Sequence, residues 1–203
     1  MGNNFSYRNA FKSSFEKQCI QLIVEAYQVV LAEKKYSSDW LENDFTSLLN
    51  NAIENSSYRI HNKISNKREK YLFSEVKADH KGFADSEDRI DLVFSTFRAN
   101  KEYCHFFEAK RLKESDSSLH KRYIATGIDS FLSGKYPKGC MIAYLVEGNV
   151  HNAINSGINK MLIKHNREKE ILYRVNISIH EYYYESTHLN WGILKHLILD
   201  FTI

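Results

Sequence analysis

Apolar side chains recur at every third or fourth position over two stretches near the N-terminus. Over residues 8–35 the recurring residues are Phe11, Phe15, Cys19, Ile23, Tyr27 and Val30. Over residues 40–54 they are Leu41, Phe45, Leu48, Leu49 and Ile53. This spacing gathers apolar residues on one face of a helix. The sequence therefore predicts two amphipathic helices, and the polar run SSD marks the start of the second.

The middle of the chain changes to shorter apolar runs. Residues 89–97 (RIDLVFSTF) and 102–112 (EYCHFFEAKRL) predict two strands, which a turn at 98–101 joins into a hairpin. Residues 71–78 (YLFSEVKA) predict a further strand. Residues 58–70 are polar and basic, and we expect a loop or a frayed helix there.

Helices and strands alternate after the hairpin. Residues 117–134 predict a helix that ends at a glycine, and residues 139–148 predict a continuous apolar strand. Residues 149–165 predict another helix, and residues 172–184 and 194–203 are strand-like. Helices first, then a block of strands, then alternation is the order expected of an α/β sandwich with a mixed sheet.

Composition adds a size, a charge and a cysteine count. A chain of 203 residues is expected to form one domain, and its net charge of +3 permits a nucleic-acid partner without requiring one. Three cysteines without CxxC spacing argue against a disulfide framework and a structural zinc site, and they favour a cytoplasmic protein. Apolar runs stay well below membrane-spanning length, so we expect no membrane association.

Both strands of the expected hairpin carry charge where core residues are expected. Asp91 interrupts the first strand, and Glu108 and Lys110 lie near the end of the second. Because side chains alternate along a strand, Glu108 and Lys110 share a face, and strand pairing can place Asp91 beside them. A half-buried carboxylate pair repels itself, and a divalent cation offsets that repulsion better than a lysine alone.

A structural ion pair at a strand end would give the same loose pattern of charges. The position of both acids within adjacent apolar strands favours a functional site instead. Other chemistries lack their motifs in this sequence. The nine histidines show no HxxxH or HExxH spacing, and the chain has neither a GxxxxGK[ST] phosphate loop nor a G-x-S-x-G serine elbow.

Asp91 followed by Glu108-Ala109-Lys110 resembles the signature of the PD-(D/E)XK nucleases. The segment LENDFTSLL resembles the acidic first core helix of that superfamily, and GIDSFLSGKYPKGCMIAYLVEG resembles the helix and strand that follow its active-site hairpin. Ile90 stands where the signature has its proline. The chain is similar to small nuclease-like proteins of phage defence systems or mobile elements.

The resemblance implies a restriction-endonuclease-like α/β/α sandwich around a central mixed β-sheet. It implies a single nuclease-like domain over residues 1–203. Within this domain, residues 1–37 would form a helical extension, residues 38–160 the catalytic core, and residues 161–203 the C-terminal strands.

The implied activity is Mg²⁺-dependent hydrolysis of phosphodiester bonds in nucleic acid, with Mn²⁺ as a substitute and DNA favoured over RNA. Asp91 and Glu108 would hold the metal together with the carbonyl oxygen of Ala109, and Lys110 would orient or help to deprotonate the attacking water. The alternative is a catalytically inactive member of the same fold that serves as a nucleic-acid-binding or assembly subunit.

Further residues complete the expected site. Glu42 is the candidate third acid, with Asp44 as its substitute, because Asp39 and Glu42 also have the spacing of a helix-capping box. Arg111 and Arg122 are expected to contact nucleic acid. The sequence leaves open whether a homodimer or a partner subunit supplies specificity.

Overall fold

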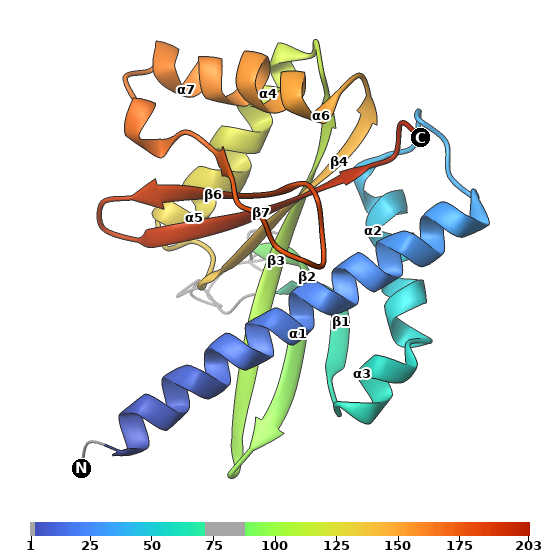
Figure 1. The fold of residues 1–203 in the computed structure, drawn as a ribbon, viewed down its shortest axis with the longest axis vertical. Helices are drawn as coiled ribbons and strands as arrows, with labels where there is room; N and C mark the ends of the chain where they lie inside the picture. The colour runs from blue at the N-terminus through green and yellow to red at the C-terminus, as the bar shows by residue number, and fades with distance from the viewer. Residues whose placement is uncertain (1–2, 72–87) are drawn as a thin grey trace, which may run out of the picture.

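A mixed sheet of seven strands runs through residues 3–71 and 88–203, which are the residues that the computed structural model describes (Figure 1). The strands are β1 (Ser65–Tyr71), β2 (Arg89–Arg98), β3 (Lys101–Lys113), β4 (Gly139–Glu147), β5 (Tyr173–Arg174), β6 (Tyr183–His188) and β7 (Gly192–Asp200). Their order across the sheet is β1-β2-β3-β4-β7-β6-β5. β4 pairs in parallel with β3 and β7, and the other neighbours are antiparallel.

Three helices precede the strands, and one helical segment follows each of β3 and β4. The helices are α1 (Asn3–Glu33), α2 (Glu42–Glu54), α3 (Ser57–His61), α4 (Ser117–Arg122), α5 (Asp129–Leu132), α6 (Val150–Asn152) and α7 (Lys160–Lys164). The π-helical turns η2 (Tyr123–Ile128) and η3 (Ala153–Asn159) join α4 to α5 and α6 to α7, and η4 (Glu168–Glu170) is a 3₁₀ turn. Helical structure thus runs through most of the two segments expected after the hairpin.

Helices cover both faces of the sheet, which confirms the expected α/β sandwich. α1 runs diagonally across one face, and with α2 it buries a core that includes Phe45 and Phe107 (Figure 1). The helical segments that follow β3 and β4 cover the other face, where Tyr123 and Met141 belong to a second core. Each core is a layer between helices and sheet.

The expected hairpin is present as β2 and β3. Its turn uses Ala99 and Asn100 at positive φ (49° and 58°), which is the backbone of a two-residue hairpin turn that follows the twist of the strands. The ladder between the strands runs from Arg98–Lys101 to Leu92–Phe107. Continuing the same register by one residue places Asp91 opposite Glu108.

The loop or frayed helix expected over residues 58–70 is wrong. The chain forms the short helix α3 there and then the strand β1, which pairs with β2 from Ser65–Ser95 onward. β1 lies at the edge of the sheet. An edge strand can be highly charged, because charge on an edge discourages pairing with other molecules. The polar sequence of β1 therefore did not indicate a strand.

The stretch 172–184 is also different from the single strand expected. Only Tyr173–Arg174 and the start of β6 are strand, and they are the two arms of one antiparallel pair. The chain between them turns back through an isolated bridge that joins Ile177 to His180. An apolar stretch that folds onto itself carries the same alternation as a straight strand, so periodicity alone did not reveal the turn.

The two ends of the chain take part in the same sheet and cores as its middle. α1 contributes Phe15 and Ile23 to the core beneath the sheet, and β7 pairs with β4 near the sheet centre. Among the described residues, none of the helices combines the length and the apolar character needed to cross a membrane. The strand expected over 71–78 falls, beyond Tyr71, outside the described residues.

Candidate functional site

β2 and β3 bring Asp91, Glu108 and Lys110 together at the point where their ladder ends. The backbone amide of Ala109 donates a 2.7 Å hydrogen bond to Asp91 Oδ2. This bond replaces the strand-to-strand bond that a regular ladder would make beyond Leu92. Asp91 is therefore held by the backbone between Glu108 and Lys110, as the strand parity predicts.

The ammonium group of Lys110 lies among oxygen atoms and is nearly inaccessible to solvent. It donates hydrogen bonds to Glu108 Oε1 and, over 2.9 Å, to the carbonyl oxygen of Ala109. Glu42 Oε1 lies 3.7 Å away. The stem of Lys110 packs against Gly127 of η2, because a methyl group added at Gly127 would lie 3.6 Å from Lys110 Cγ. The helical layer thus closes over the lysine.

α2 directs Glu42, its first residue, toward the same cluster. Glu42 Oε2 accepts a 2.9 Å hydrogen bond from the backbone amide of Arg111, and Oε1 accepts one of 2.9 Å from Arg122 Nη2. Asp44 instead caps the helix, because its Oδ2 accepts from the amide of Leu41 over 2.8 Å. The structure therefore brings Glu42 to the site and leaves Asp44 outside it.

Glu108 is the least satisfied member of the cluster. Its Oε2 is buried and has no hydrogen-bond partner among the described residues. Burial, and then the charge of Asp91, raise the pKa of Glu108 to about 8 despite the attraction of Lys110. Burial also raises the pKa of Asp91, although Lys110 and the Ala109 amide oppose that rise. Ionisation of either carboxyl group in the folded protein therefore costs free energy.

The two arginines occupy different positions. Arg122 has a half-exposed side chain and bridges from α4 to Glu42, so it stands at the mouth of the site. Arg111 Nη1 donates to the carbonyl oxygen of Trp40 over 2.9 Å, which ties β3 to the segment before α2. Arg122 is thus better placed than Arg111 to meet a ligand.

Tyr136 is a member of the site that sequence reasoning missed. It lies in the connection between α5 and β4 and is buried. Burial raises its pKa first, and the charges of Glu108 and Asp91 raise it further, which shows that the phenol lies near both acids. A lone tyrosine between two glycines carries no motif, so nothing in the sequence marked it.

The donor atoms of this cluster suit a hard divalent cation. Asp91, Glu108, Glu42 and the Ala109 carbonyl offer oxygen atoms only, and magnesium and manganese prefer such ligands. Among the described residues Glu108 Oε2 has no hydrogen-bond partner, and burial raises the pKa of both acids, so their ionisation without an added cation costs free energy. His105 faces the opposite side of β3, where its ring contacts Phe107, so it supplies no nitrogen ligand here.

Comparison with known proteins does not identify a family for this chain. The chain matches no protein-family model, and it matches neither a curated protein nor a solved structure. The function therefore has to be inferred from the residues of the site themselves.

Proposed function

We propose that the protein is a metal-dependent nuclease of the PD-(D/E)XK type, which hydrolyses phosphodiester bonds in nucleic acid. One observation carries the proposal. Two carboxylates and a lysine from adjacent strands meet Glu42, the first residue of α2, in one buried cluster. One carboxylate oxygen of this cluster has no hydrogen-bond partner among the described residues. The order of these residues along the chain is that of the nuclease signature.

The cluster can hold Mg²⁺ or Mn²⁺ through Asp91, Glu108 and the Ala109 carbonyl, and the bound ion would polarise the phosphate and acidify a water. The remaining steps would depend on side chains of the protein. Lys110 would hold and orient the attacking water and stabilise negative charge on the phosphate. Glu42 fixes the position of Lys110 and of Arg122, and Arg122 would contact a phosphate of the substrate at the mouth of the site.

One feature supports a non-catalytic alternative. Lys110 and Arg122 already pair with the acids, and Asp91 already satisfies the Ala109 amide, as in a structural ion cluster. Such a cluster would let the protein act as a nucleic-acid-binding or assembly subunit. The two functions differ in metal dependence and in what happens when one acid is removed.

The first test is cleavage of plasmid DNA, single-stranded DNA and RNA by the purified protein. We expect cleavage in millimolar Mg²⁺ or Mn²⁺, loss of cleavage in excess chelator, and recovery when either ion is restored. Calcium should support substrate binding without cleavage, since it acidifies water less. DNA is expected to be the better substrate. Full activity in excess chelator would remove the metal from the mechanism.

The residues are tested by Asp91→Asn and Glu108→Gln, which keep the shape of each side chain and remove its charge. Each variant should lower the rate at least a hundredfold, because both remove a charged metal ligand. Glu147→Gln is the matched control, since Glu147 pairs with Lys113 at the surface of the neighbouring strand. Equal losses in the control and the site variants would contradict the assignment.

A further inference from the structure

A second cluster of ligand-type side chains lies on the opposite face of the sheet, beneath α1. Glu16 of α1, His105 of β3 and Cys140 of β4 each offer one ligand atom, and these three atoms lie within 4.8 Å of one another. His105 Nε2 and Cys140 Sγ are 3.2 Å apart. His105 and Cys140 are buried, and Glu16 is half-buried. The cluster shares no residue with the candidate nuclease site.

The fold explains why these residues meet although they are far apart in the sequence. β3 and β4 pair in parallel with Phe107 opposite Cys140, and His105 lies on the same face as Phe107, two residues earlier. α1 crosses this face and brings Glu16 down onto it. Cys19 follows Glu16 by about one helical turn and is buried in the same core.

The donor set selects a class of metal. A thiolate, an imidazole and a carboxylate are the ligands of Zn²⁺ and similar transition ions, whereas Mg²⁺ and Ca²⁺ avoid sulfur. Zinc bonds of about 2.0–2.3 Å place tetrahedral ligand atoms roughly 3.3–3.8 Å apart. The 3.2 Å between His105 Nε2 and Cys140 Sγ is close to that range, so small side-chain movements would complete the geometry.

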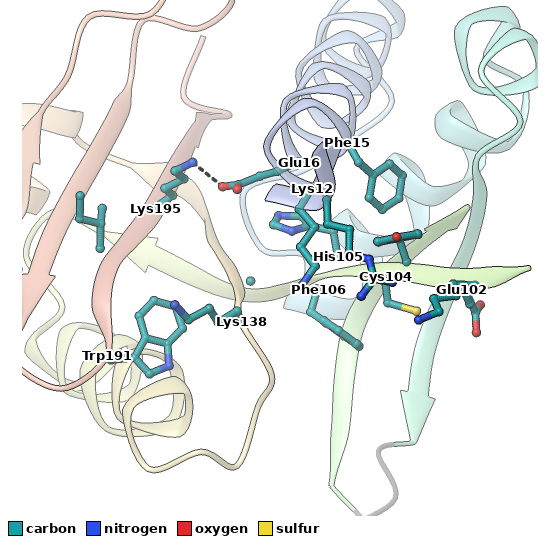
Figure 2. Close-up of a pocket in the computed structure, with 15 residues that line it drawn as sticks. Lys12, Phe15, Glu16, Glu102, Cys104, His105, Phe106, Lys138, Trp191 and Lys195 are labelled. Atoms are coloured by element: carbon teal, nitrogen blue, oxygen red, sulfur yellow. Dashed lines mark hydrogen bonds and ion pairs between the residues drawn. The ribbon is translucent and has the colours of Figure 1, made fainter. Parts of the chain in front are cut away.

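An open pocket of about 820 Å³ reaches Glu16 and His105, and Cys140 is buried beside His105. Figure 2 shows Glu16 and His105 in its wall, with Lys195 of β7 forming an ion pair with Glu16. The pocket gives an ion a route of entry and leaves room for a water ligand. Lys195 contacts one oxygen of the Glu16 carboxylate, so the other oxygen remains for a metal.

We propose that Glu16, His105 and Cys140 form a binding site for Zn²⁺ or a similar transition-metal ion, with a water as the fourth ligand. Binding transfers the Cys140 thiol proton to solvent, and the thiolate and the Glu16 carboxylate then balance the charge of the ion. The three ligands belong to α1, β3 and β4, so the ion would fasten the N-terminal helix to the sheet. The site would stabilise the fold and take no part in phosphodiester cleavage.

The test is titration of the metal-free protein with Co²⁺, which takes the place of zinc and gives a thiolate-to-cobalt absorption band. The Glu108→Gln background removes binding at the nuclease site. We expect one equivalent of Co²⁺ to give the band, and Zn²⁺ to displace it and to raise the melting temperature. Cys140→Ser should abolish the band. Cys104→Ser should keep it, because Cys104 lines the same pocket outside the cluster.

Three further variants test the site if Cys140→Ser does not fold. Glu16→Gln alters a half-buried helix residue and should weaken Co²⁺ binding at least tenfold, whereas Glu25→Gln on the same helix should not. Lys195→Met should tighten binding, because it removes a competing cation from Glu16. Absence of a thiolate band in the folded parent protein would overturn the proposal. So would Co²⁺ affinity that is equal in the Glu16→Gln and Glu25→Gln variants.

Discussion

Glu108 is the residue whose surroundings oppose its charge most clearly. Its unpartnered oxygen and its raised pKa, about 8 against an ordinary value of 4.5, have the same origin in burial beside Asp91. The folded protein therefore binds a proton at Glu108 more tightly than the unfolded chain does. Glu108 therefore stabilises the folded protein fully below about pH 4.5, and this contribution is lost as the pH rises toward 8. The raised pKa of Asp91 changes stability with pH in the same direction.

We expect Glu108→Gln to reduce this dependence of stability on pH. The wild-type free energy of unfolding should fall by at most about 1.4 kcal/mol per pH unit from this group between pH 4.5 and 8, and the variant should lack that contribution. Denaturant unfolding at a series of pH values measures it. Glu102→Gln, an exposed position on the same strand, serves as the control. Parallel curves for wild type and Glu108→Gln would contradict the effect of burial.

At the level of elements, the start of α2 has two acids with separate tasks. Asp44 caps the helix through the Leu41 amide, and Glu42 reaches across to Arg111 and Arg122. Sequence spacing offered both acids for the third position in the site. The choice depends on where the helix begins, which spacing defines only to within a residue or two.

The two acids in the first turn of α2 should respond differently to loss of charge. Asp44→Ala should lower the free energy of unfolding by about 1 kcal/mol and leave cleavage unchanged, since it removes only a cap. Glu42→Gln should lower cleavage at least tenfold with a smaller effect on stability. Cleavage rates and chemical unfolding of both variants measure this. Loss of cleavage in Asp44→Ala together with full cleavage in Glu42→Gln would reverse the assignment.

The sequence predicted the elements whose own periodicity is strong, such as α1, α2, the β2–β3 hairpin and β4. It did not predict β1, whose charged residues become a strand only through pairing with β2. Strand parity was enough to bring Asp91, Glu108 and Lys110 together, because they lie on one hairpin. Tyr136 and the Glu16–His105–Cys140 cluster depend on contacts between distant segments, and such contacts leave no local signal in one sequence.

Across the whole molecule, buried neutral histidines join the layers. His196 of β7 contacts the hydroxyl of Tyr123 in η2 through Nδ1 and that of Ser186 in β6 through Nε2, each over 2.8 Å. Burial lowers the pKa of His196 to about 3, and burial lowers that of His105 beneath α1 to about 4. Protonation of either ring in the folded protein therefore costs free energy.

His105 and His196 should lower the free energy of unfolding as the pH falls from about 6.5 toward 3 or 4, against the opposite contribution of Glu108. In that range the unfolded chain binds protons at His105 and His196 and the folded protein does not. A falling pH therefore stabilises the unfolded state relative to the folded state. Each histidine contributes up to about 1.4 kcal/mol per pH unit. His196→Gln should reduce the slope of unfolding free energy against pH, and His151→Gln, at an exposed position, should not. Identical slopes in the two variants would show that His196 does not govern acid unfolding.

The central claim is that the cluster around Lys110 cleaves phosphodiester bonds and is not a structural ion pair. The most direct measurement is the rate of DNA cleavage in Mg²⁺ by Glu108→Gln relative to wild type, taken with the melting temperature of the same samples. A catalytic site predicts cleavage reduced at least a hundredfold and a melting temperature that holds or rises, because one of two repelling carboxylates is neutralised. Undiminished cleavage with a large drop in melting temperature would contradict the account, since a broken structural pair leaves Lys110 buried without its partner.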